Sequence, residues 1–295
     1  MHVLADRIQS LLSDRYVIER ELGHGGMAVV FLARDLRHDR PVAIKVFRSD
    51  IGDAPGAERF RREIKLLAKL QHPHILPLYD SGTTGETNYF VTAYVDGETL
   101  RERMKREPLV PIDDAVHLTM EVADALDFAH THNVIHRDIK PENILQHDGH
   151  AVVADFGIAR AMRRTGGDWT TAVGMMVGSP AYMSPEQSMG DRDLDGRADI
   201  YSLASVLYEM LAGRPPFTGR SAHMMIAARL SGVPDRVRTH RPEVSQALEA
   251  ALAKALERAP ADRFASAGEF GAALAESIQP HGPEPKRKRW PFGSL

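Results

Sequence analysis

The alternation of apolar and polar positions changes character after about one third of the chain. Before that point, short runs rich in β-branched and aromatic residues are separated by turn-forming residues, a pattern typical of strands. A helical pattern interrupts them from Ala57 to Leu70, with Phe60, Ile64 and Leu67 on one stripe. The predicted strands cover 16–23, 28–35, 41–47 and 88–95.

From about residue 97 onward the periodicity becomes helical. The segment 113–132 is amphipathic, with one apolar stripe, and 199–211 is apolar almost all round, which predicts a helix buried in a core. Asp199 can cap the N-terminus of that buried helix, and Gly213 stands near its C-terminal end. The second part of the chain is therefore expected to be mainly α-helical.

A strand-rich half followed by a helix-rich half predicts an α+β chain of two lobes. We expect an N-lobe over 16–95 and a C-lobe over 96–278, preceded by a helical extension at 1–15. The segment 279–295 is different, because it holds four prolines and the basic block Lys286–Arg289 and has little apolar content. Such a composition predicts a disordered tail.

Composition and charge narrow the class of protein. The chain has 295 residues and a formal net charge of −3, whereas a nucleic-acid-binding domain is usually strongly basic. The absence of cysteine excludes disulfides, thiolate zinc sites and cysteine nucleophiles. No apolar run of roughly 18 residues occurs, and charges interrupt the N-terminal segment, so neither a membrane span nor a signal peptide is predicted. These features favour a cytoplasmic location.

Three glycines lie between the first two predicted strands, in the segment 23–28, GHGGMA. Glycines there let the backbone approach a phosphate and donate N–H groups to it, although a plain hairpin has the same composition. A dinucleotide-binding turn is a further alternative, but it requires a helix next and an acidic residue ~20 residues later. Here a strand follows, and Lys45 occupies that distance.

Lys45 itself lies in the apolar run VAIK, and a lysine in a buried strand needs an anionic partner. Glu63 is a candidate, because it falls within the apolar stripe of the helix that is predicted next. A glutamate on an inward face is costly unless it is paired, which favours an ion pair with Lys45. The alternative is a glutamate that bends out to water.

The densest group of reactive side chains is HRDIKPEN, residues 136–143, and the tripeptide DFG follows at 155–157. A short apolar strand is predicted for 151–154, so that Asp155 comes at its end. Asp155 and the amide oxygen of Asn143 are the oxygen ligands that Mg²⁺ prefers. The histidines show no H-E-x-x-H pattern, so a magnesium site is favoured over a histidine site.

In chain order, the glycine segment, VAIK, a helix glutamate, HRDIKPEN, DFG and SPE resemble the eukaryotic-type (Hanks-type) protein kinases. The runs HGGMAVVF and GIAR are most similar to bacterial serine/threonine kinases of the receptor-like type. The resemblance covers about Tyr16 to Leu274. It implies a bilobal protein-kinase fold, and transfer of the ATP γ-phosphate to serine or threonine hydroxyls of proteins, including the activation loop of the kinase itself.

The same resemblance implies that ATP lies between the lobes, with the glycine segment over its phosphates. The hinge at 93–95 would bond the adenine edge, with Thr92 at the back of the pocket. Ala28 stands where many kinases have a third glycine, which leaves this loop slightly stiffer. The implied nucleotide-binding residues are Leu22, Gly23, Gly25, Gly26, Val30, Ala43, Lys45, Ala93, Val95 and Leu145.

For catalysis, the resemblance implies that Asp138 orients the substrate hydroxyl and accepts its proton, while Lys140 neutralises the γ-phosphate. Lys45 would hold the α- and β-phosphates. A lysine two residues after Asp138 is the serine/threonine pattern. The implied catalytic residues are Asp138, Lys140, Lys45 and Glu63, and the implied ligands of Mg²⁺, with Mn²⁺ as an alternative, are Asn143 and Asp155.

The segment between DFG and SPE resembles an activation loop, in which Thr170 and Thr171 are the implied phosphorylation sites. Arg137 would pair with a phosphothreonine there, although ordinary polar loop residues are an alternative reading. Glu186 and Arg263 resemble a buried ion pair. The implied structural or regulatory residues are Arg137, Phe156, Gly157, Ser179, Glu186, Asp199 (which would brace the catalytic loop) and Arg263.

Two other functions share these lobes. A nucleotide-binding pseudokinase or scaffold would be favoured by loss of Lys45, Asp138 or Asp155, and a metabolite kinase is expected to lack SPE; this chain keeps all of them. The expected partners are protein substrates and a second copy that binds through the N-lobe, but not nucleic acid. A membrane would be a partner only if the chain is the cytoplasmic part of a longer protein, with the basic block next to the bilayer.

Overall fold

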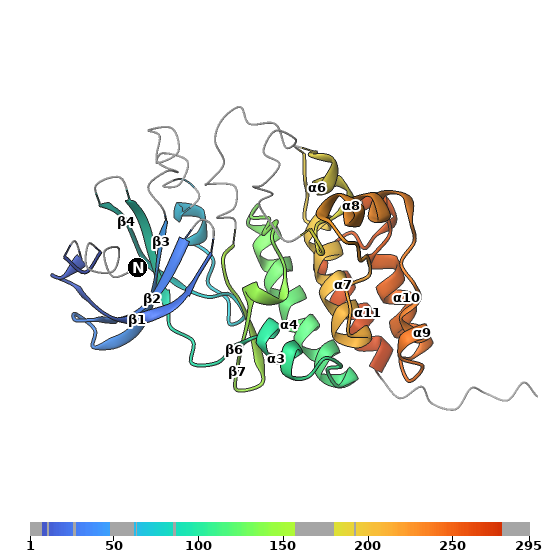
Figure 1. The fold of residues 1–295 in the computed structure, drawn as a ribbon, viewed down its shortest axis with the longest axis horizontal. Helices are drawn as coiled ribbons and strands as arrows, with labels where there is room; N and C mark the ends of the chain where they lie inside the picture. The colour runs from blue at the N-terminus through green and yellow to red at the C-terminus, as the bar shows by residue number, and fades with distance from the viewer. Residues whose placement is uncertain are drawn as a thin grey trace, which may run out of the picture.

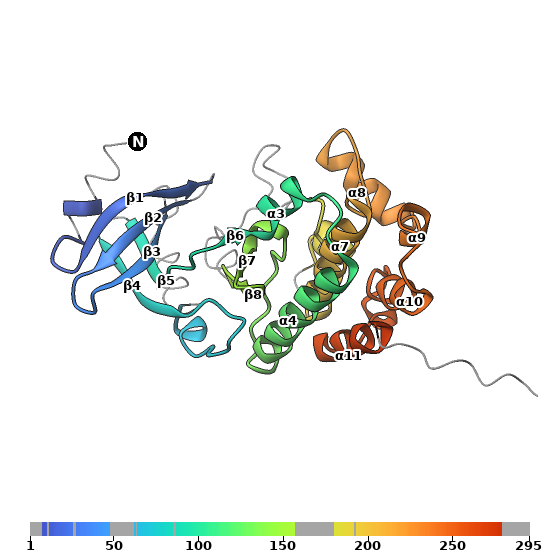
Figure 2. The same cartoon turned by 90° about the horizontal axis from the view of Figure 1, so that it is seen from below.

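The computed structural model describes residues 8–10, 12–25, 28–47, 62, 64–84, 87–156, 180–191 and 193–278. Figures 1 and 2 show a β-sheet at one end of the molecule and a group of helices at the other, with a small sheet between them. A β-rich N-lobe followed by a helical C-lobe confirms the predicted α+β class.

The large sheet is antiparallel, with strand order β1-β2-β3-β5-β4. The four predicted strands are present, and β4 is an additional strand that the hydrophobic pattern did not predict. β4 is an edge strand with a single neighbour, so it tolerates more polar residues than a central strand. Its polar run DSGTT conceals the alternation of apolar and polar positions. The strands are β1 Tyr16–His24, β2 Ala28–Asp35, β3 Arg40–Phe47, β4 Leu78–Thr84 and β5 Thr87–Ala93.

Strand β3 shows how the sheet divides its two faces. Val42, Ile44 and Val46 are buried on one face, together with Ile8 of the helical segment before β1. Because side chains alternate along a strand, Lys45 points to the other face. The alternation thus places a lysine from an apolar run at the side of the sheet that faces the helical half.

A short sheet connects the halves, with strand order β6-β7-β8. The residues at 94–97 link β5 to β6, where the boundary between the lobes was predicted. The elements of this part are β6 Glu98–Thr99, α3 Leu100–Arg106, α4 Ile112–Thr131, η2 Pro141–Asn143, β7 Ile144–His147 and β8 His150–Val153.

The helical half is built around α4 and α7, which contact each other, and α11 packs along α4 (Figure 2). Every residue of α7 from Ala198 to Leu211 is buried, as its largely apolar sequence predicted. The remaining elements are α6 Pro185–Met189, α7 Arg197–Ala212, α8 Ala222–Ser231, α9 Val237–His240, α10 Gln246–Ala255, η3 Pro260–Asp262 and α11 Ala267–Ile278.

The two ends of α7 differ from each other in how well they were predicted. Gly213 ends the helix in the left-handed conformation with φ of 72°, as expected. The prediction that Asp199 caps the N-terminus is wrong, because the N-cap is Gly196 and Asp199 lies in the first turn. The Asp199 carboxylate is instead used by another segment, described below.

Parts of several predicted segments fall outside the described residues: 57–61 and 63 of the helix at 57–70, 1–7 and 11 of the extension at 1–15, and the tail at 279–295. In the described part of the predicted helix, residues 64–67 are helical and Ile64 is buried. In the extension, Ile8 and Leu12 are buried against the outer face of the sheet. No helix in the described part of the chain combines the length and apolar composition needed to cross a bilayer.

Candidate active site

A cleft of about 750 Å³ lies between the large sheet and the helical half. Its volume is within the range of roughly 300–1,000 Å³ that is usual for small-molecule sites. All predicted nucleotide-binding, metal-binding and catalytic residues that the structure describes line this single cleft. They are Leu22, Gly23, Gly25, Val30, Ala43, Lys45, Ala93, Val95, Asp138, Lys140, Asn143, Leu145 and Asp155.

Lys45 meets Asp155 across the cleft, with 2.5 Å between the lysine Nζ and the carboxylate Oδ2. Asp155 follows β8, and its left-handed backbone, with φ of 64°, is a conformation that aspartate tolerates better than most residues. Burial by itself would raise the pKa of Asp155, but the charge of Lys45 and its hydrogen bond outweigh burial and lower the pKa. The carboxylate is therefore anionic at neutral pH.

The second group of side chains comes from the loop between α4 and β7. The Lys140 Nζ lies 2.6 Å from Oδ2 of Asp138. The Asn143 amide nitrogen donates to the Asp138 carbonyl at 2.8 Å and to its carboxylate at 3.2 Å. These contacts hold the Asp138 carboxylate, the Lys140 ammonium group and the Asn143 amide close together. The short helix η2 ends this segment at Asn143.

The backbone of this loop is fixed by Asp199, which is fully buried. One carboxylate oxygen accepts the N–H of His136 at 2.8 Å, and the other accepts the N–H of Arg137 at 2.7 Å. His130 adds a third contact at 2.8 Å. Burial would raise the pKa of Asp199, but the His130 hydrogen bond, nearby positive charge and the Arg137 N–H together lower it.

His136 has a structural role in this arrangement. Its Nδ1 accepts the N–H of Asp138 at 3.2 Å, so the ring proton belongs on Nε2, which donates to the Ala154 carbonyl at 2.8 Å. The ring also packs on Phe156, with 4.6 Å between the ring centroids. His136 is fully buried, and with both ring nitrogens in these contacts it connects the loop of Asp138 to the segment of Asp155.

A residue that the sequence did not single out also supports the loop. The Gln187 side chain donates to the Arg137 carbonyl at 2.8 Å, and the N–H of Ser184 donates to its amide oxygen. Arg137 has a left-handed φ of 69°, so its backbone is held on both sides, by Asp199 and by Gln187. The signal for Gln187 was a Ser-x-x-Gln capping box, which predicts a helix start but not this contact.

Behind the same segment, Arg263 donates to both carboxylate oxygens of Glu186 at 2.7 Å each. Both side chains are buried, and the guanidinium also bonds the carbonyls of Glu257, Arg197 and Arg258. A buried pair of this kind is stable only when its remaining donors are satisfied, which they are here. The pair ties α6 to the residue that follows η3.

Six of the predicted site residues lie outside the described part of the chain, so their positions stay predictions. The partner expected for Lys45 on the helix after β3 is among them; within the described residues Lys45 forms an ion pair with Asp155. The six are Gly26, Glu63, Gly157, Thr170, Thr171 and Ser179.

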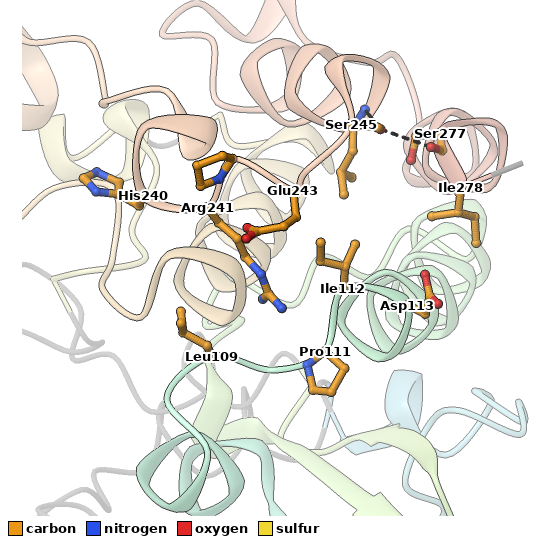
Figure 3. Close-up of a pocket in the computed structure, with 12 residues that line it drawn as sticks. Leu109, Pro111, Ile112, Asp113, His240, Arg241, Glu243, Ser245, Ser277 and Ile278 are labelled. Atoms are coloured by element: carbon orange, nitrogen blue, oxygen red, sulfur yellow. Dashed lines mark hydrogen bonds between the residues drawn. The ribbon is translucent and has the colours of Figure 1, made fainter. Parts of the chain in front are cut away.

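Volume alone does not identify the site. A second hollow of about 800 Å³ opens at the far end of the helical half, between the start of α4 and the segment after α9 (Figure 3). Arg241 and Glu243 line it, and the Ser245 hydroxyl donates to the Ser277 carbonyl at its wall. None of the predicted site residues lines this hollow. What distinguishes the first cleft is the set of convergent charged groups.

Comparison with known proteins agrees with this geometry. The family model described as "Protein kinase domain" matches residues 16–274. The serine/threonine-protein kinase PknB of Mycobacterium tuberculosis is 42% identical over 283 residues, which are 94% of this chain and 44% of that protein. PknB of Mycolicibacterium smegmatis is 40% identical over 279 residues, 92% of this chain and 44% of that protein.

A more distant relative is the probable serine/threonine-protein kinase PknB of Bifidobacterium longum, 39% identical over 272 residues, or 88% of this chain and 39% of that protein. The chain thus spans less than half the length of the curated relatives that it matches. The matches confirm the resemblance drawn from the motifs. The chain belongs to the protein kinase family, and its domain is similar to those of bacterial Hanks-type serine/threonine kinases.

Proposed function

We propose that this chain is the catalytic part of a serine/threonine protein kinase, which transfers the γ-phosphate of ATP to hydroxyl groups of protein substrates. The observation that carries the proposal is the convergence of Lys45, Asp138 and Asp155 in one cleft, although they come from different lobes or elements. The acceptor class rests on the names of the relatives and on Lys140, two residues after Asp138.

In this function Asp138 is the residue that receives the substrate hydroxyl. Its carboxylate lies at the cleft and is held by Lys140 and Asn143, so an acceptor hydroxyl can donate a hydrogen bond to it. As the oxygen attacks the γ-phosphorus, its proton passes to Asp138 and the bond to the β-phosphate oxygen breaks. Lys140 lies next to the reacting groups and stabilises the charge that develops on the phosphoryl oxygens.

Lys45 and Asp155 serve the nucleotide. Lys45 is placed to hold phosphate oxygens, and Asp155 is anionic beside it. Asn143 and Asp155 fit a Mg²⁺ ion, because the Asn143 nitrogen is used toward Asp138 and its amide oxygen is left for a hard cation. When bound, Mg²⁺ neutralises phosphate charge in this reaction.

Transfer of label from γ-labelled ATP, with Asp138→Asn as the comparison, tests the proposal. The amide keeps the size of the side chain but removes the proton acceptor, so we expect transfer to fall by about 10²–10⁴-fold. Asp148→Asn is the matched control, because Asp148 is 87% exposed in the turn between β7 and β8. Equal transfer by the native chain and Asp138→Asn contradicts the kinase function, and retained ATP binding with no transfer by either supports the scaffold alternative.

Thr170 and Thr171 are part of the same proposal as sites of autophosphorylation. A phosphate there adds nearly two negative charges, which a cationic side chain such as Arg137 can pair with. Mass spectrometry after incubation with ATP is expected to find phosphate on one of these threonines in the native chain but not in Asp138→Asn. Phosphate found only elsewhere removes both residues from this role.

A further inference from the structure

A cluster of two histidines and one glutamate lies away from the cleft, where α4 meets β8. His117 and Glu121 are one helical turn apart on α4, and His150 is the first residue of β8. One ligand atom from each side chain lies within 4.8 Å of the others. The catalytic chemistry uses none of these side chains.

The position of each donor is fixed by regular structure. Residues four apart on a helix share a face, so His117 and Glu121 project together. His150 directly follows the two-residue turn Asp148-Gly149, whose left-handed φ values of 50° and 84° are typical of a tight hairpin. All three side chains therefore stand on helix or strand, where a metal site is held more accurately than on a loop.

Glu121 is the centre of the cluster. Its side chain is 9% exposed, whereas those of His117 and His150 are 60% and 63% exposed. One carboxylate oxygen accepts the N–H of Ala151 at 2.7 Å, which fixes the plane of the carboxylate. The other oxygen lies 2.6 Å from Nδ1 of His150 and 3.4 Å from Nε2 of His117.

These distances suit a small transition-metal ion. With metal–ligand bonds of about 2.0–2.1 Å, two ligands of a tetrahedral ion lie about 3.3–3.4 Å apart, which is the His117–Glu121 separation. At present one proton lies in the hydrogen bond between His150 and Glu121, whose atoms are 2.6 Å apart. An ion that replaces this proton requires their two atoms to separate by less than about 1 Å, which an exposed histidine ring allows. Water from the open side completes the coordination.

We propose that His117, Glu121 and His150 form a binding site for a divalent transition-metal ion of the zinc class, separate from the site for the nucleotide metal. Imidazole nitrogens favour Zn²⁺, Cu²⁺ or Ni²⁺, whereas Mg²⁺ prefers oxygen ligands and is not expected here. The Ala151 N–H acts as an outer partner that orients the carboxylate, the arrangement usual around metal ligands. No spacing motif reveals this site, because His150 comes from a different element.

The bound ion joins α4 to β8. His74 also contacts this junction, because its Nδ1 lies 2.8 Å from the Ala151 carbonyl. The far end of β8 leads to Asp155, at most about 16 Å along the strand from His150. The ion is therefore expected to stabilise the strand that leads to Asp155, without itself binding the nucleotide.

Calorimetric titration of the full chain without a histidine tag, by ZnCl₂ with millimolar Mg²⁺ present, tests the proposal. We expect one Zn²⁺ per chain. His117→Ala and His150→Ala should each weaken binding at least about tenfold, since even outer partners of metal ligands cost about 10- to 100-fold when they are removed. His223→Ala, an exposed histidine on α8, is the matched control and should leave the affinity unchanged.

A second measurement distinguishes coordination by these three side chains from non-specific binding of metal ions. Co²⁺ bound by two imidazoles and one carboxylate gives visible absorption that depends on the ligands, and the double variant of His117 and His150 should lose it. Because both rings are exposed, these variants are expected to fold, and circular dichroism checks this. The proposal is overturned if no Zn²⁺ binds, if binding survives in the double variant, or if Asp155→Asn removes it instead.

Discussion

The loop that carries Asp138 and the glycine segment at the end of β1 line the same cleft, but they are held in opposite ways. Buried side chains bond the backbone of the loop at several points, from Asp199, His136 and Gln187. At the end of β1, Gly23 and Gly25 are exposed, and no atom lies within 4 Å of where a Cβ would be placed on either.

This difference in how the two segments are held follows from their different tasks in the reaction. A group that accepts a proton must be held close to its productive geometry, because a displacement of ~1 Å can cost about 100-fold in rate. A segment that covers phosphates gains its contacts from the nucleotide itself, and an open backbone lets N–H groups reach the ligand. The comparison therefore predicts that changes beneath the loop affect rate and stability, while changes in the glycine segment affect nucleotide binding.

The largest effect is expected from Asp199→Ala. Removing the buried carboxylate leaves the N–H groups of His136 and Arg137 without their acceptor, so the free energy of unfolding should fall by about 3–5 kcal/mol. Transfer should drop at least about 100-fold, since Asp138 is no longer held. Urea unfolding and a transfer assay measure the two effects.

The matched control for this prediction is Asp195→Ala, because Asp195 forms an exposed pair with Arg197 just before α7. Exposed pairs contribute about 0–1 kcal/mol, so the control should remain close to the native chain. Equal losses in the two variants would mean that burial of Asp199 does not set the geometry of the loop.

The next effect concerns pH. Because the folded pKa of Asp199 lies below its ordinary value of about 3.9, its contribution is complete above that value and is lost as the pH falls through the folded pKa. The free energy of unfolding of the native chain should therefore decrease more steeply between about pH 5 and pH 2 than that of Asp199→Asn. Parallel curves from denaturant titrations across this range would contradict the lowered pKa.

A smaller effect is expected from Gln187→Ala, which removes the donor to the Arg137 carbonyl and the acceptor for the Ser184 N–H. An unsatisfied buried group costs about 1–3 kcal/mol, and transfer should slow because Arg137 precedes Asp138. Gln187→Glu separates the two contacts, since a glutamate still completes the capping box but cannot donate to Arg137. If the glutamate variant transfers at the native rate, the bond to Arg137 does not position the loop.

The smallest effect on stability is expected from Gly23→Ala. The added methyl group meets no protein atom, so the free energy of unfolding should change by less than about 0.5 kcal/mol. The KM for ATP should rise by less than about tenfold, which corresponds to about 1.4 kcal/mol.

Gly213→Ala provides the opposite result for comparison. Its left-handed φ of 72° at the end of α7 penalises any side chain, so this variant should lose about 1–2 kcal/mol of stability with no change in the KM for ATP. Thermal unfolding and steady-state kinetics on both variants give the full comparison. A loss of stability in Gly23→Ala without a change in its KM for ATP would contradict the difference drawn between the glycine segment and the loop of Asp138.

The sequence alone determined much of this protein, for physical reasons that act locally. Alternation in β3 and the largely apolar run of α7 predicted a strand and a buried helix, because the spacing of apolar residues reflects which of them are buried. The order of VAIK, HRDIKPEN and DFG resembles the protein kinases, and this resemblance implied which residues meet in the cleft. The capping box that begins at Ser184 and the glycine that ends α7 at Gly213 are also local signals, because each depends only on residues that are close in sequence.

Only the tertiary structure decided which partners these residues take. The residue pattern alone reads Asp199 as a helix cap, and it was the resemblance to the kinases that implied its role beneath the catalytic loop. In the structure its carboxylate bonds the backbone of 136–137, more than sixty residues away in sequence. The capping box that contains Gln187 did not predict its contact with Arg137, and the cluster around Glu121 had no signal, because these partners come from other elements. A buried carboxylate bonds whichever donors the folded chain brings to it, and packing at long range, which no local pattern encodes, determines those donors.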